Sequence, residues 1–177
     1  MPGYLSLDRV DYANMNEETR MHLLRHLGRS MGYFHRRRAI HGDAHGGNIL
    51  VRMDRLLREP EHPENIMYLD AETFKPLVRR PNPSTYLQDT QMLATHARLM
   101  GLVREPHDLH RHFYPNYMDV WRGSHIESEV AKIPPTELTR EISTEKDWGD
   151  TEGKRLRAGL RERLYRRLGI FGEKDVD

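Results

Sequence analysis

The sequence predicts an α+β fold that is mainly helical and contains a small β-hairpin. Apolar residues recur at helical spacing through residues 16–38, which indicates a long amphipathic helix. Two short apolar runs, 49–53 and 66–70, are separated by a connection that contains prolines, a pattern typical of paired strands. Helical spacing returns in residues 86–102 and 106–121, so helices outnumber strands in this prediction.

The composition is that of one ordinary domain with a heavily charged surface. The chain has 177 residues, enough to bury a core, and 31% of them are charged. It has no cysteine, which excludes disulfides and thiolate chemistry. The net charge of +1 gives no general electrostatic reason to expect a nucleic-acid partner. No apolar stretch reaches the length of a signal peptide or a membrane span, so we expect no transmembrane segment and a cytoplasmic location.

The first predicted elements are a short strand and a long helix. Apolar and polar residues alternate in 4–10, although an edge strand or an unstructured start fits this stretch equally well. Asn16 is a favourable helix N-cap, and Glu17 and Glu18 suit the positive end of the helix dipole. Basic residues at 35–38 end the helix as a solvated cluster. The predicted core-facing residues of this helix are Leu23, Leu24, Leu27, Met31 and Phe34.

The segment 41–51 carries the densest chemistry in the chain. Asp43 follows His41 by two residues and precedes Asn48 by five, the H-x-D-x-x-x-x-N spacing of phosphotransferase catalytic loops. At this spacing Asp43 can accept the proton of a substrate hydroxyl while Asn48 offers its amide oxygen to Mg²⁺. A second acidic metal ligand is needed on the next strand, where the sequence provides Asp70.

Two other interpretations of this segment remain open. A His-Gly-Asp sequence by itself is also typical of a turn with a capping aspartate. His41, Asp43 and His45 alternate along the chain and could hold a metal if the segment were extended. The three glycines of the loop favour turns over such regular alternation.

The sequence motif His-Gly-Asp-x-His-x-Gly-Asn-Ile-Leu resembles the catalytic loop of the kinase-like superfamily. The resemblance is to the branch that contains the aminoglycoside and choline phosphotransferases and several atypical kinases. The resemblance implies a protein-kinase-like C-terminal lobe that uses ATP and Mg²⁺, with Asp43 as catalytic base and Asn48 and Asp70 as metal ligands. The family's Phe-Gly after the metal-binding aspartate is replaced by Ala71 and Glu72, which favours a small-molecule hydroxyl acceptor. Glu72 could assist the metal or form a salt bridge.

The resemblance also implies supporting residues around the loop. His41 and His45 belong to the motif itself. In kinase-like folds an aspartate near the start of the following helix hydrogen-bonds the loop backbone, which gives Asp89 this role. A first-turn aspartate that interacts only with the helix dipole is the alternative. Ser84 and Thr85 are candidate caps of that helix.

The remaining helical segments are predicted to pack in the core, and Asp89 is the one residue in them for which a role at the loop is expected. The core side of 86–102 is predicted to carry Leu87, Met92, Leu93, Leu99 and Met100. The core side of 106–121 is predicted to carry Leu109, Phe113, Tyr117 and Trp121. The surface histidines of that segment are His107, His110 and His112. The connection 54–65 is predicted to be exposed, and 153–169 to form a basic closing helix.

These patterns predict a hinge-like strand and linker at 1–15, a kinase-like large lobe at 16–125 and a charged helical extension at 126–177. A glycine-rich loop and a phosphate-binding lysine normally precede the hinge, but the first lysine here is Lys75, and no nucleotide-binding residue can be named. We therefore expect an incomplete phosphotransferase or one whose small lobe comes from a second chain. A non-catalytic pseudokinase-like interaction module and an atypical protein kinase fragment are the alternatives.

Overall fold

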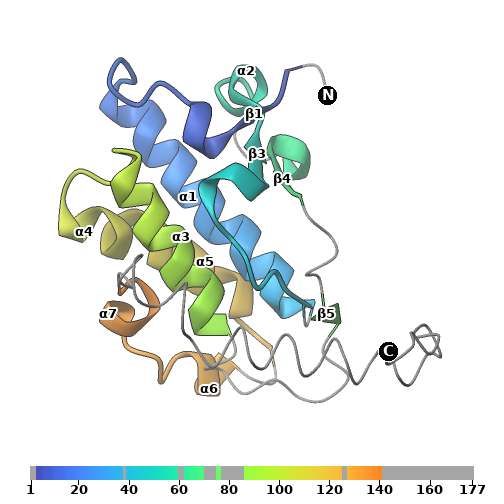
Figure 1. Cartoon of the computed structure of the whole chain (residues 1–177). Coiled ribbons are helices and arrows are strands. Elements are labelled where there is room, and N and C mark those ends of the chain that lie inside the picture. Colours follow the sequence, from blue (N-terminus) through green and yellow to red (C-terminus); the bar gives the residue numbers. More distant parts are fainter. Residues whose placement is uncertain are drawn as a thin grey trace, which may run out of the picture. The chain divides into compact units, whose positions relative to one another are not determined.

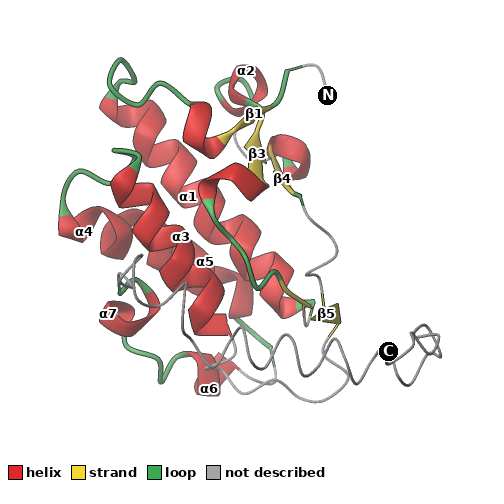
Figure 2. Cartoon of the chain, viewed as in Figure 1, coloured by secondary structure: helices red, strands yellow, loops and turns green. Residues whose placement is uncertain are grey.

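The computed structural model describes residues 3–37, 39–59, 62–69, 75–76, 86–124 and 127–140. All of them belong to the unit Met1–Glu141, and the second unit of the chain, Ile142–Asp177, lies outside them. The described part is mainly helical, with a three-stranded and a two-stranded antiparallel sheet (Figure 2). The predicted α+β class is therefore confirmed. Within the described ranges, no helix is both long and apolar enough to cross a membrane.

Helix α1, Glu17–Arg36, is the longest described element and runs through the middle of the helical part (Figure 1). It begins as predicted, because the Asn16 side chain accepts a hydrogen bond from the Thr19 amide at 2.8 Å. Four of the five predicted core residues of α1 are buried, and Phe34 is partly buried. The prediction of a solvated basic end is wrong for His35, whose side chain is completely buried.

Helix α5, Tyr114–Trp121, packs against α1 at very close range. A Cβ atom added at Gly32 would lie 2.9 Å from the Tyr117 carbonyl oxygen, and one added at Gly28 would collide with the Phe113 carbonyl oxygen. The two glycines therefore let the backbone of α1 lie close to α5 and to Phe113, the residue that precedes α5. The preceding elements are helix α4, Pro106–Asp108, and a π-helical segment, Leu109–Phe113.

The core forms around α1, α5 and helix α3, Leu87–Leu99. The predicted buried side of 106–121 is confirmed, because Leu109, Phe113, Tyr117 and Trp121 are all at most 4% exposed. Met92 and Leu93 are buried as predicted, but Leu99 is 67% exposed because the helix ends there and the chain turns at Gly101, whose φ is 82°.

Two short helices complete the described part of this core. They are α6, Glu127–Val130, and α7, Pro135–Leu138. Val130 and Leu138 are fully buried in the same core as α1. The packed unit therefore continues past residue 125, the predicted end of the lobe.

The predicted hairpin is present. Strand β3, Ile49–Val51, pairs with β4, Ile66–Tyr68, in an antiparallel register that places Ile49 opposite Tyr68. Strand β1, Leu5–Ser6, adds to the other edge of β3. Strands β2, Ala39–Ile40, and β5, Lys75–Pro76, form a separate antiparallel pair.

The first strand is shorter than predicted. The chain forms strand only at Leu5–Ser6 and continues as a 3₁₀ helix, Leu7–Arg9. Leu7 is fully buried, and its carbonyl oxygen accepts a hydrogen bond of 2.7 Å from the Tyr12 hydroxyl. Burial of Leu7 therefore favours a turn toward the core over a longer strand.

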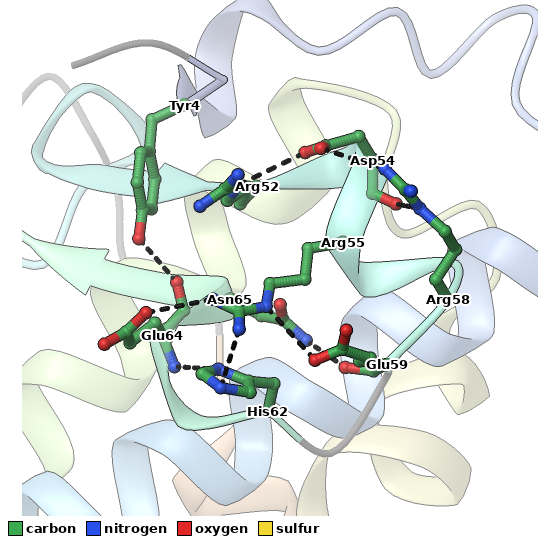
Figure 3. A network of polar contacts seen from close by, with 9 residues as sticks. All are labelled: Tyr4, Arg52, Asp54, Arg55, Arg58, Glu59, His62, Glu64 and Asn65. Atoms are coloured by element: carbon green, nitrogen blue, oxygen red, sulfur yellow. Dashed lines mark hydrogen bonds and ion pairs between the residues drawn. The ribbon is translucent and has the colours of Figure 1, made fainter.

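The connection between β3 and β4 is only partly the exposed segment that was predicted. It contains helix α2, Met53–Leu56, whose Leu56 is 1% exposed, and a 3₁₀ helix, Pro63–Asn65. Its outer surface is a network of polar side chains centred on Arg55, which pairs with Glu64 at 2.9 Å and with Glu59 at 3.3 Å (Figure 3).

Candidate functional site

The predicted catalytic loop connects β2 to β3 (Figure 1). Gly42 has a φ of 75°, a left-handed conformation that favours glycine. The loop ends in a 3₁₀ helix, Gly46–Asn48, which is capped by the His45 ring: its Nδ1 atom accepts the Gly47 amide at 3.0 Å. The shape of the loop therefore depends on residues within the loop. Gly42 allows its turn, and His45 caps its 3₁₀ helix.

Asp89, in the first turn of α3, holds the loop backbone from the core side. Its carboxylate is 1% exposed, and its two oxygens accept the Gly42 amide at 2.7 Å and the His41 amide at 2.6 Å. The predicted contact between Asp89 and the loop backbone is therefore present. A first-turn aspartate that interacted only with the helix dipole would not make these contacts.

His35 and Tyr117 extend this support into the core. The Nε2 atom of His35 lies 3.2 Å from Asp89 Oδ2, and its Nδ1 atom lies 2.9 Å from the Tyr117 hydroxyl. His35 and Tyr117 are both 0% exposed. Sequence reasoning missed both roles. The available signal was that His35 follows Met31 by four residues, which places it on the apolar side of α1.

The pKa of Asp89 lies below its ordinary value of 3.8. Burial raises this pKa, but hydrogen bonds from His35 and from the two loop amides lower it by more. Asp89 is therefore a buried carboxylate kept charged by three donors, which is the condition under which such a group is tolerated.

His41 ties the loop to the end of strand β4. Its Nε2 atom donates to the Leu69 carbonyl oxygen at 2.8 Å, and its Nδ1 atom accepts the Asp43 amide at 3.3 Å, which requires the neutral Nε2–H tautomer. The Leu69 amide donates to the Asn48 carbonyl oxygen at 2.8 Å. Both backbone polar groups of Leu69 are therefore bonded to the loop.

The carboxylate of Asp43 is held through one of its two oxygens. The side-chain amide of Asn48 donates to Asp43 Oδ2 at 3.2 Å and to the Asp43 carbonyl oxygen at 3.1 Å. The Nε2 atom of His45 lies 3.7 Å from the same Oδ2. Asp43 Oδ1 is buried and has no hydrogen-bond partner among the described residues. The loop thus fixes the orientation of this carboxylate and leaves one oxygen without a partner.

The alternative metal site on His41, Asp43 and His45 does not form. Both ring nitrogens of His41 are occupied by backbone groups. Over the described residues, no group of three or more His, Cys, Asp or Glu side chains could hold a metal ion. The predicted metal ligand Asp70 and the supporting Glu72 lie outside the described residues, as do Ser84, Thr85 and the segment 153–169.

His96, a further residue that sequence reasoning missed, lies beside the loop. Its ring centroid is 5.5 Å from that of His45. Burial lowers the pKa of His96, the nearby His45 lowers it further, and the carboxylates of Asp43 and Asp8 act in the opposite direction. A helical spacing of seven residues from Asp89 was the only available sign that His96 shares the loop-facing side of α3.

No protein-family model, curated protein or solved structure matches this chain. The geometry of the loop is therefore the basis on which its function can be proposed.

Proposed function

We propose that residues 41–51 form the catalytic loop of a Mg²⁺-dependent phosphotransferase that moves the γ-phosphoryl group of ATP to a hydroxyl. One observation carries this proposal. Asp43 is fixed by Asn48 through Oδ2, whereas its Oδ1 atom has no partner in the described part of the chain. The loop that carries Asp43 is bonded to the buried Asp89. A carboxylate that is held in place yet keeps one free acceptor suits a general base.

In phosphoryl transfer the protein acts mainly by positioning the reactants and by stabilising the charge that develops on the phosphoryl group. The acceptor oxygen forms a bond to the γ-phosphorus, the bond from that phosphorus to the β–γ bridging oxygen breaks, and ADP leaves. The carboxylate of Asp43, which is 22% exposed, takes the proton that the hydroxyl loses. A positioned general base contributes about 10²–10⁴-fold to the rate, so even a small displacement of the loop would reduce turnover.

The donor set of this region fits Mg²⁺, which prefers oxygen ligands. The side-chain nitrogen of Asn48 faces Asp43. The side-chain oxygen of Asn48, Oδ1, therefore remains available as a metal ligand. Asp70 follows Leu69 directly in the chain, and Leu69 is bonded to the Asn48 backbone. Bound Mg²⁺ would supply positive charge that neutralises the negative charge developing during transfer.

A small molecule is the proposed acceptor. Its support is the Ala71-Glu72 sequence, which replaces the Phe-Gly pair through which regulated protein kinases switch between states.

Calorimetric titration of the full 177-residue chain with ATP, with and without Mg²⁺, tests the proposal. We expect binding that requires Mg²⁺ and that weakens about tenfold or more in Asp70→Asn, because the ligand loses its negative charge. Asp54→Asn is the matched control, since Asp54 is 48% exposed and lies on α2, and it should bind as the wild type does. Asp43→Asn should also keep its affinity, because Asp43 acts in transfer.

Two results would count against the proposal in different ways. An unchanged Mg²⁺–ATP affinity in Asp70→Asn would remove Asp70 from the metal site. If the wild type bound no nucleotide in the presence of Mg²⁺, the proposal would fail for this chain by itself. An enzyme completed by a second chain, or a non-catalytic interaction module, would then be the better explanation.

A further inference from the structure

The solvent face of α1 carries a row of basic residues that the proposed reaction does not use. These residues are three or four positions apart, so they lie on one side of the helix. Past Glu18 this helix has no acidic residue. The row includes one aromatic residue, Tyr33, whose side chain is 53% exposed. The row consists of His22, Arg25, Arg29, Tyr33 and Arg36.

Two further arginines enlarge this surface. Arg37 follows the row at the end of α1, and Arg111 is exposed on the neighbouring π-helical segment. Burial lowers the pKa of His112, and the positive charges of Arg25 and Arg111 lower it further, whereas the carboxylate of Asp108 acts in the opposite direction. Arg25 therefore lies close enough to the π-helical segment to act on one of its side chains. We call Arg25, Arg29, Tyr33, Arg36, Arg37 and Arg111 the α1 basic surface.

Three charges of the α1 basic surface have no carboxylate partner among the described residues. Across the part of the chain that the structure describes, Arg25, Arg37 and Arg111 form no ion pair with a carboxylate. On the β3–β4 connection, by contrast, Arg55 pairs with two glutamates. Uncompensated like charges on one face favour an anionic partner.

We propose that the α1 basic surface binds single-stranded nucleic acid, with the arginines on successive phosphates and a base stacked on Tyr33. Arg25 and Arg36 are separated by about 16 Å along the helix axis, with a basic or aromatic residue about every 5–6 Å between them. All the cations of the surface are arginines. The planar guanidinium group of arginine binds phosphate through two hydrogen bonds and stacks on aromatic rings.

An exposed aromatic ring distinguishes this partner from an acidic peptide. Single-stranded binders combine a positive track for the backbone with aromatic rings on which unstacked bases lie. A peptide of Asp and Glu residues would use the arginines but would gain nothing from Tyr33. The expectation that the protein has no nucleic-acid partner rested on a net charge of +1, which averages over the whole chain and does not reveal one basic face.

The first test is fluorescence anisotropy of a fluorescein-labelled 12-nucleotide oligouridine with the full chain. The variant Arg25→Gln, Arg37→Gln, Arg111→Gln removes three exposed charges and keeps helix-compatible side chains. We expect at least a tenfold loss of affinity, and a slope of log K against log salt that is smaller by about 2, because three phosphate contacts are lost. Wild-type affinity and slope in this variant would overturn the proposal.

A matched control removes the same number of charges from the basic segment 153–169. The variant is Arg155→Gln, Arg157→Gln, Arg161→Gln, and we expect its affinity to stay within about twofold of the wild type. If this control lost binding while the α1 variant kept it, the binding site would lie in 153–169, and the proposal would be wrong.

Tyr33 decides between a nucleic acid and an acidic polypeptide. Tyr33→Ala should reduce oligouridine affinity by about 5–100-fold, and Tyr33→Phe should retain it, because the ring supplies the stacking. Circular dichroism and the melting temperature check that both variants are folded. An unchanged affinity in Tyr33→Ala, together with equal displacement of the oligonucleotide by polyglutamate, would assign the surface to an acidic protein partner instead.

Discussion

The polar contacts beneath the loop and those on the β3–β4 connection use similar residues in opposite settings. Asp89 is 1% exposed and accepts three hydrogen bonds within the core. Arg55 is 24% exposed, and its partners Glu59 and Glu64 are 58% and 66% exposed (Figure 3). When a buried polar group loses its hydrogen-bond partner, water cannot take the partner's place, whereas an exposed group can bond to water instead. The buried contacts should therefore dominate stability and hold the loop, although the exposed network contains more ion pairs.

The largest effect is expected for Asp89→Ala. This change leaves the His41 and Gly42 amides and the His35 ring without their acceptor, so we expect a loss of about 4–5 kcal/mol in the free energy of unfolding. Urea denaturation followed by circular dichroism measures it. Asp54→Ala, on the exposed connection, should lose less than about 1 kcal/mol. Similar losses in the two variants would contradict the comparison.

Arg20→Met extends the comparison to a buried ion pair on α1. Arg20 lies 2.7 Å from Asp108, and the two side chains are 4% and 6% exposed. Removing Arg20 leaves the Asp108 charge and the Leu102 carbonyl oxygen without this donor. We expect a loss of about 3–4 kcal/mol in the same denaturation experiment. Arg58→Met removes an arginine that is 75% exposed, and a loss as large as that of Arg20→Met would refute the role assigned to burial.

A third prediction concerns pH. Burial, together with nearby Arg29, lowers the pKa of His26 from 6.5 to about 4 in the folded protein. Between these values the unfolded chain binds a proton that the folded protein does not, so stability should fall as the pH falls from about 6.5 to 4 and be flat just above this window. We expect His26 to contribute about 1–2 kcal/mol, below the full value of its shift because it is not completely enclosed.

Denaturation of wild type and His26→Gln at pH 7 and at pH 4.5 measures this contribution. The difference between the two pH values should be smaller in the variant. A residual difference should remain, because the pKa values of His96 and His112 are also lowered. The charge of Asp89 is lost only below its ordinary pKa of 3.8, outside this range. Equal differences in both proteins would show that His26 is not the group responsible.

The smallest effect is expected for Arg55→Met. It removes the centre of the exposed network, and we expect a loss of less than about 1 kcal/mol because these pairs are solvated. The loss should shrink further in 0.5 M salt, which screens exposed pairs. A loss above about 2 kcal/mol, insensitive to salt, would show that the network behaves like the buried contacts.

Features of the fold that depend on local signals could be predicted from the sequence. The Asn16 cap, the apolar side of α1 and the β3–β4 hairpin each follow from spacing or side-chain chemistry within a few residues. The turn at Leu7 and the exposure of Leu99 could not, because both depend on which surface the rest of the chain covers.

The same division holds within the candidate site. The motif spacing identified Asp43 and Asn48, and the structure joins them by a hydrogen bond. The bond from His41 to Leu69 and the contact of His35 with Tyr117 join residues 28 and 82 positions apart, which no local pattern reveals. Asp89 was identified only because a family resemblance assigns a role to an aspartate at this place on the helix.

The most direct test of the proposed function is ADP formation by the full chain with Mg²⁺–ATP, with water as the acceptor, in the wild type and in Asp43→Asn. We predict turnover that requires Mg²⁺, and a rate that is lower by about 10²–10⁴-fold in Asp43→Asn while ATP affinity is retained. Asp54→Asn should turn over as the wild type does. Equal rates in the wild type and Asp43→Asn would contradict the assignment of Asp43 as the catalytic base.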